Sequence, residues 1–150
     1  MTKNTFAIAS DHGGFELKES LAQYLREQEL EVVDLGTHGT DAVDYPDYAD
    51  EMSKWIIKNN NGIGILICGS GIGMSIAANR NHGVRAALCH DGLSASLARR
   101  HNDANVICLG ARLIGIETAK DCVSQFTNSE FEGGRHQSRV DKLSNTKEKP

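Results

Sequence analysis

The chain has 150 residues, of which 39% are hydrophobic, 24% charged and 5% aromatic, and this length and balance predict one globular domain over residues 1–150. Its 16 Lys and Arg residues against 20 Asp and Glu residues give a formal net charge of −4, which argues against a nucleic-acid binder. No apolar run approaches the roughly 20 residues of a membrane span and no signal-peptide pattern opens the chain, so we expect a cytoplasmic protein without a membrane partner.

Apolar runs of strand length alternate along the chain with segments of helical periodicity, which is typical of a parallel sheet covered by helices on both faces. The predicted strands are residues 5–10, 31–35, 62–68, 84–89 and 105–109. The predicted helices are residues 15–28, 46–58, a helix ending near 79, 93–100, 115–126 and a short C-terminal helix around Val140 and Leu143. The expected fold is therefore a doubly wound α/β sandwich with a C-terminal helical tail, and residues 145–150 are expected to fray.

The most informative motif is CGSGIG at residues 68–73, between an apolar strand and a helix. Its three glycines let the backbone turn tightly, and the following helix directs its free N–H groups toward an anion. Ligands of doubly wound sheets bind at this end of the strands. A nucleotide-binding loop is the alternative, but the motif lacks the G-x-G-x-x-G spacing and the chain has no G-x-x-x-x-G-K-[ST] motif.

Cys68 ends the third predicted strand at the mouth of this loop, where the helix N-terminus favours a thiolate that can serve as a base or a nucleophile. The alternative for any cysteine is a small buried hydrophobe. We favour that alternative for Cys89, Cys108 and Cys122. The four cysteines form no C-x-x-C pair, so the sequence indicates neither a zinc ribbon nor dithiol redox chemistry.

Asp11 and His12 follow the first strand, at the same edge of the sheet as Cys68. Asp11 suits proton exchange or a sugar hydroxyl and His12 suits an anion, whereas the plain alternative is an Asp helix cap beside an exposed histidine. His101 and Asn102 lie before the last strand, where a simple turn is the alternative. Because a segment entering a strand lies at its amino end, a catalytic His101 would serve a neighbouring subunit.

Arg135, His136 and Arg139 lie within about one helical turn of one another, with the two arginines on the same face. Paired guanidinium groups suit a phosphate, and a solvated charged face is the alternative. Residues 61–150 carry 11 basic and 8 acidic groups, against 5 and 12 in residues 1–60. The basic excess therefore lies in the part of the chain that holds these arginines.

Five motifs together resemble, in order and spacing, the type B ribose-5-phosphate isomerases over residues 5–143. They are SDHGG at 10–14, DYP at 44–46, CGSGIG at 68–73 running into IAAN at 76–79, RRHNDAN at 99–105 and EGGRHQSRV at 132–140. The resemblance implies a Rossmann-like three-layer fold with a five-stranded parallel sheet. It further implies interconversion of ribose 5-phosphate and ribulose 5-phosphate in the pentose phosphate pathway, without cofactor or metal, by a homo-oligomer whose subunits share the active site.

The same resemblance implies a catalytic role for each of four residues. Cys68 is the base that moves the proton between C1 and C2, because this chain has Met74 where one branch of the family has a glutamate. His101 opens the sugar ring with help from Asp11, and Ser70 and Asp11 relay the proton between the two oxygens. The substrate-binding residues implied by the resemblance are Gly69, Gly71, Ile72 and Gly73 for the enediolate, Tyr45 and Asn102 for hydroxyls, and His12, Arg135, Arg139 and, as a further candidate, Arg112 for the phosphate.

Two other functions remain open from the sequence. Isomerases of allose 6-phosphate or galactose 6-phosphate resemble the same fold and loop, and an extra carbon changes only the reach between base and phosphate. A non-catalytic phosphate- or nucleotide-binding module is the second alternative, but it would not need Cys68 beside the glycine loop. The choice between dimer and tetramer is also open.

Overall fold

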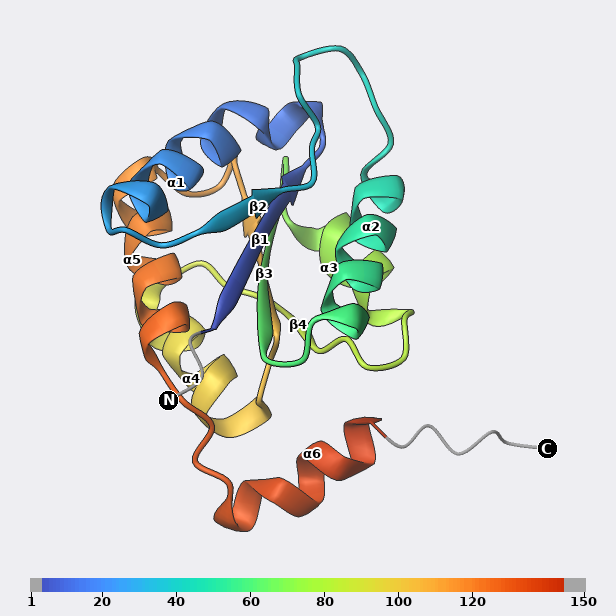
Figure 1. The fold of residues 1–150 in the computed structure, drawn as a ribbon, viewed down its shortest axis with the longest axis vertical. Helices are drawn as coiled ribbons and strands as arrows, with labels where there is room; N and C mark the ends of the chain where they lie inside the picture. The colour runs from blue at the N-terminus through green and yellow to red at the C-terminus, as the bar shows by residue number, and fades with distance from the viewer. Residues whose placement is uncertain (1–3, 145–150) are drawn as a thin grey trace, which may run out of the picture.

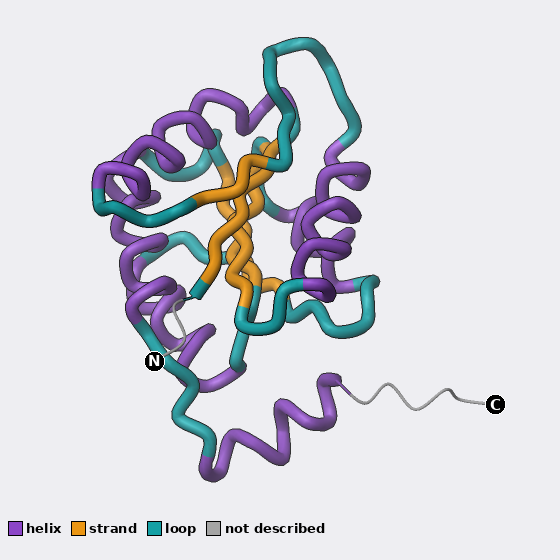
Figure 2. Tube along the Cα trace, in the orientation of Figure 1, coloured by secondary structure: helices purple, strands orange, loops and turns teal. Residues whose placement is uncertain are grey.

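A computed structural model describes residues 4–144 and has a five-stranded, all-parallel sheet at its centre, in the order β2-β1-β3-β5-β4 (Figures 1 and 2). The strands are β1 (Thr5–Ser10), β2 (Val32–Asp34), β3 (Gly62–Cys68), β4 (Ala86–Leu88) and β5 (Val106–Gly110). The bounds of β1 and β3 are those predicted. The edge strands β2 and β4 are shorter than predicted, because each pairs with its single neighbour over three residues, β2 with β1 and β4 with β5.

Helices cover both faces of the sheet (Figure 1). They are α1 (Phe15–Glu27), α2 (Tyr45–Lys58), α3 (Ile72–Asn79), α4 (Gly92–Asn102), α5 (Ile116–Asn128) and α6 (Gln137–Ser144), with short 3-10 helices η1 (His12–Gly14) and η2 (Gly134–His136). A hydrophobic core lies on each face of the sheet, and alternate residues of β1 point into the two cores. Ile8 packs with α1 and α5 on one face, and Ala9 packs with α2 and α3 on the other. Every residue of β3 is buried, as expected for a central parallel strand. The predicted three-layer, Rossmann-like α/β fold is confirmed.

Helix α4 ends two residues later than predicted, so that His101 and Asn102 occupy its last turn instead of a connecting turn. Asp103 ends the helix in the left-handed region, with φ 46°. The Arg99 guanidinium fixes this end by donating to Asp103 Oδ1 at 3.1 Å and to the carbonyl of Ala104. The helix end therefore depends on a side-chain contact that helical periodicity does not reveal.

The short C-terminal helix is present as α6, which lies beyond α4 at the amino end of the sheet (Figure 1). Residues 145–150, which were expected to fray, lie outside the described residues. Within residues 4–144, no helix combines the length and the apolar character needed to span a membrane.

Candidate active site

The loop between β3 and α3 is seated on the carboxyl end of β5. Gly71 has a φ of 75°, in the left-handed region that favours glycine. A Cβ at Gly71 would lie 2.6 Å from Leu88 Cδ1 and 2.9 Å from the backbone of Leu109. A Cβ at Gly110 would lie 2.5 Å from the carbonyl oxygen of Ser70. These two glycines let the loop approach β5 closely and fix its shape.

Replacing Gly71 with alanine is expected to lower the free energy of unfolding by about 2–5 kcal/mol, because a left-handed non-glycine residue costs about 1–2 kcal/mol and overpacking costs about 1–3 kcal/mol. Urea denaturation measures the change. Gly39→Ala is the matched control, since a Cβ at Gly39 would meet no atom within 4 Å. Equal stability of the two variants would contradict the steric argument.

The Cys68 thiol lies beside the N–H donors of this loop. Cys68 is 4% exposed, and its Sγ accepts a hydrogen bond from the Gly71 N–H at 3.1 Å. The Ile72 N–H donates to Ser70 Oγ at 3.2 Å. Within the described residues, the N–H groups of Gly73 and Met74 in the first turn of α3 have no hydrogen-bond partner. The loop thus combines a thiol with donors that can bind an oxyanion.

Asp11 lies against the same loop. Its N–H donates to the Ile67 carbonyl at 3.2 Å, and its Oδ1 accepts from the Gly14 N–H at 3.1 Å. Gly13 lies in ordinary contact range of the loop, since a Cβ there would lie 3.5 Å from the Gly69 nitrogen. Asp11 therefore caps the N-terminus of η1. The second carboxylate oxygen of Asp11 makes no hydrogen bond within residues 4–144, and this oxygen is available to a ligand.

His12 anchors the long loop between β2 and α2, which rises above this end of the sheet (Figure 1). The exposed His12 ring accepts a hydrogen bond at Nδ1 from the Val43 N–H at 3.1 Å. In a neutral imidazole this bond leaves the ring proton on Nε2, which can donate to an anion. Tyr45, the first residue of α2, packs on α3, since a Cβ at Gly73 would lie 2.5 Å from Tyr45 Cζ.

Arg112 is also brought to the glycine loop. Its N–H donates to the Gly69 carbonyl at 2.9 Å, and a Cβ at Gly69 would lie 3.4 Å from Arg112 Nε. The guanidinium is exposed, so it can meet a ligand directly. Pairing of β5 with β3 causes this proximity, because Gly110 lies opposite Cys68 in the ladder.

The remaining predicted residues lie at the opposite end of the sheet. His101 and Asn102 end α4, which leads into the amino end of β5, while Arg135 and Arg139 belong to η2 and α6 nearby (Figure 1). The structure therefore does not bring these four residues to Cys68 of the same chain. That His101 serves a neighbouring subunit stays a prediction.

The sequence places His136 among cationic residues and indicates no separate role for it, whereas in the structure it contacts His101 directly. The two rings stack with centroids 4.3 Å apart and planes 13° from parallel. Partial burial lowers the pKa of His136 below its usual value, and the nearby His101 and Arg135 lower it further. The one signal in the sequence was its place between Arg135 and Arg139.

The other three cysteines are core residues, as expected. Cys89, Cys108 and Cys122 are buried, and burial raises the pKa of each thiol. The pKa of Cys122 rises to about 12. These thiols therefore remain protonated near neutral pH.

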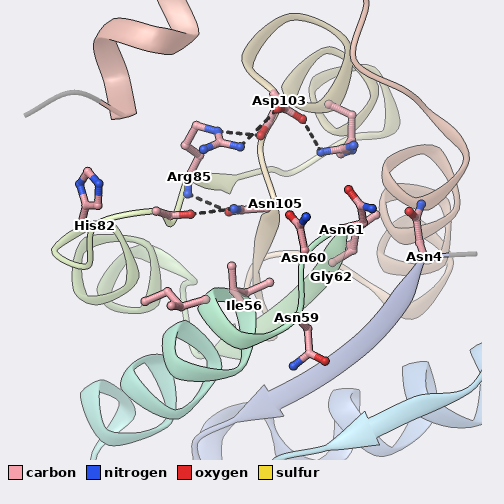
Figure 3. Close-up of a pocket in the computed structure, with 14 residues that line it drawn as sticks. Asn4, Ile56, Asn59, Asn60, Asn61, Gly62, His82, Arg85, Asp103 and Asn105 are labelled. Carbon is pink, nitrogen blue, oxygen red and sulfur yellow. Dashed lines mark hydrogen bonds and ion pairs between the residues drawn. The ribbon is translucent and has the colours of Figure 1, made fainter. Parts of the chain in front are cut away.

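A cavity of about 490 Å³ lies at the amino ends of β3 and β5, away from the glycine loop (Figure 3). Arg85 Nε donates to the Asp103 carbonyl at 2.8 Å, and Asn105 Oδ1 accepts from the Arg85 N–H at 2.8 Å. None of the residues predicted for the active site lines this cavity. Its polar groups join the segments that enter β4 and β5.

The chain is similar in sequence and fold to known proteins. Residues 6–143 match the family described as "Ribose/Galactose Isomerase". Ribose-5-phosphate isomerase B of Escherichia coli is 42% identical over 137 residues, which are 91% of this chain and 92% of that protein. A ribose 5-phosphate isomerase structure from Thermotoga maritima is 50% identical, with a TM-score of 0.92 over 95% of this chain and 99% of that one.

A structure from Mycoplasma genitalium, described as ribose-5-phosphate isomerase B with bound ribulose-5-phosphate, is 42% identical, with a TM-score of 0.92 over 96% of each chain. These matches extend over nearly the whole length of each protein compared. The sequence, the fold and the glycine loop therefore lead to one conclusion: the chain belongs to the ribose/galactose isomerase family.

Proposed function

We propose that this protein interconverts ribose 5-phosphate and ribulose 5-phosphate, as a cytoplasmic, single-domain enzyme of the pentose phosphate pathway. The observation that carries the proposal is the buried Cys68 thiol, whose loop also presents the N–H groups of Gly73 and Met74, which have no hydrogen-bond partner within residues 4–144. An aldose–ketose isomerase needs a base and an oxyanion site next to each other, and this loop supplies both. The relative that was solved with ribulose-5-phosphate supports the same substrate class.

Proton transfer between C1 and C2 is assigned to Cys68. The thiolate removes the proton from the carbon next to the carbonyl and returns it to the neighbouring carbon. The Gly71 N–H, 3.1 Å from Sγ, stabilises negative charge on sulfur. The enediolate oxygen is bound by the N–H groups at the start of α3, and each well-placed donor contributes roughly 3–4 kcal/mol to transition-state stabilisation. Ser70 and Asp11 relay the proton between the two oxygens.

Ring opening is assigned to His101 of a second subunit, with Asn102 orienting a hydroxyl. These residues and Cys68 lie at opposite ends of one sheet, so a single chain does not complete the site. Ile72 and Ile76, four residues apart on α3, are 49% and 64% exposed beside the loop. A second copy of the chain would cover this apolar surface while it brings its His101 to the loop. The active enzyme is therefore a homo-oligomer built from such dimers.

The phosphate is held by cationic groups from both subunits. His12 and Arg112 lie around the glycine loop of one subunit. Arg135 and Arg139 are exposed beside His101, and the second subunit presents them together with that histidine. Guanidinium groups bind phosphate oxygens in pairs, so this clamp fixes the distance from the phosphate to the reacting carbons.

The purified protein is expected to convert ribose 5-phosphate to ribulose 5-phosphate in a buffer that contains a chelator and no added cofactor, because the proposed steps use protein groups alone. Absorbance of the ketose product measures the rate. With allose 6-phosphate as the comparison substrate, kcat/KM is expected to be lower, since the clamp and the base are set for five carbons. No turnover of ribose 5-phosphate would contradict the proposal. A higher kcat/KM for allose 6-phosphate would favour the six-carbon alternative.

A further inference from the structure

Two imidazoles and a carboxylate meet where the last turn of α4 contacts the segment before α6. Nε2 of His101 is 3.8 Å from Glu132 Oε1, and Nε2 of His136 is 4.0 Å from the same oxygen. The ligating atoms of the three residues all lie within 4.8 Å of one another. Over residues 4–144, no other group of three His, Cys, Asp or Glu side chains is arranged in this way.

The backbone and a neighbouring arginine hold Glu132 in place. Its N–H donates to the Arg100 carbonyl at 3.0 Å, and its Oε2 accepts from Arg100 Nε at 2.8 Å. Gly133 and Gly134, with φ values of 64° and 53°, then reverse the chain so that His136 returns over His101. The Glu132 carboxylate is thus oriented through one oxygen, while Oε1 faces the two imidazoles.

We propose that His101, Glu132 and His136 form an inhibitory binding site for a divalent metal ion of intermediate softness, best matched by Zn²⁺. Imidazole nitrogen and carboxylate oxygen bind Zn²⁺ at about 2.0–2.2 Å, which places tetrahedral ligand atoms roughly 3.3 Å apart. The ligand atoms, which lie within 4.8 Å of one another, reach that spacing by approaching up to about 1.5 Å, and one imidazole tilts out of the stack so that both nitrogen lone pairs point at the ion. Mg²⁺ and Ca²⁺ fit poorly, because they prefer sites made of six or more oxygens.

Inhibition follows from the role of His101 and rests on the proposed function. A ring nitrogen that is bound to a metal has no lone pair to accept a proton, so a zinc-bound His101 does not open the sugar ring. The proposed isomerisation uses no metal, and we expect it to proceed in the presence of a chelator. Zinc binding alone does not depend on the catalytic assignment.

The binding test uses the full chain, freed of metal with EDTA, dialysed and titrated with ZnCl₂ by calorimetry in the absence of substrate. We expect about one Zn²⁺ per chain, and at least about tenfold weaker binding in His136→Gln and in Glu132→Gln, because each substitution removes one of three ligands. His82→Gln is the matched control, since His82 is exposed in the loop between α3 and β4 and lies outside the cluster. This variant is expected to bind like the unmodified protein.

Three results would overturn the inference: no zinc binding, undiminished affinity in both His136→Gln and Glu132→Gln, or loss of binding in Cys68→Ser, which would place the metal at the thiol.

The activity test compares each protein with its own rate in EDTA. The Zn²⁺ concentration that halves the rate is expected to be at least about tenfold higher for His136→Gln than for the unmodified protein. If the unmodified protein binds Zn²⁺ and is not inhibited, the inhibitory role is refuted. Absence of turnover in EDTA contradicts the proposed function alone, because zinc binding is measured without substrate.

Discussion

Cys68→Ala is expected to lower kcat for ribose 5-phosphate by about 10²- to 10⁴-fold, the usual contribution of a general base, while the fold is retained. The alanine keeps the backbone of the glycine loop and removes the sulfur that accepts the Gly71 N–H. The residual rate would come from the oxyanion donors, which the substitution leaves in place. Steady-state kinetics and circular dichroism measure the two effects.

Cys108→Ala is the matched control for this loss. Cys108 is fully buried in β5, and it lies opposite Leu66 in the ladder, two residues before Cys68 along β3. Burial raises the pKa of its thiol well above the usual range, so Cys108 has no role in proton transfer. We expect this variant to keep its kcat and to lose some stability. Full activity in Cys68→Ala, or an equal loss in both variants, would refute the assignment of the base.

Mixing Cys68→Ala with Arg139→Ala is expected to restore activity, because the two residues belong to opposite halves of a shared site. Arg139→Ala alone should raise KM by roughly 10- to 100-fold through loss of a charged hydrogen bond to phosphate. In a mixed dimer, one of the two sites contains both native residues. Random exchange of subunits then yields about one quarter of the native activity at low substrate concentration.

The control mixes Cys68→Ala with Arg112→Ala. Arg112 lies over Gly69 of the same chain as Cys68, so neither site of this mixed dimer is complete. Activity is expected to stay at the level of the parent variants. If the Arg139→Ala mixture also shows no restoration after verified subunit exchange, then the site lies within one subunit and the proposed dimer is wrong.

Much of the candidate site could be predicted because its signals are local in the chain. Cys68 ends an apolar run and begins a glycine-rich turn, and that turn determines where the thiol lies relative to the N–H groups of α3. Asp11 follows a strand in the same way. The position of His101 before the amino end of a strand could also be predicted, from the direction of a parallel strand, and His101 lies in the last turn of α4. Its assignment to another subunit stays a prediction.

Other parts of the site depend on residues that are distant in sequence. Arg112 reaches Gly69 because β5 pairs with β3, and no local pattern identifies that pairing. The stacking of His136 on His101 requires the reversal at Gly133 and the contact of Glu132 with α4. The sequence motif placed these residues in one segment but did not show which groups touch.

The sequence by itself determined the order of strands and helices along the chain, the strands β1 and β3, and the glycine loop. A strand that is buried on both faces needs a continuous apolar run, and a tight turn needs glycines, so both features can be recognised in the sequence. The tertiary structure alone decided the lengths of β2 and β4, the end of α4 and the neighbours of Arg112 and His101. Those features depend on hydrogen bonds and packing between segments far apart in the chain, which the periodicity of a single segment does not record.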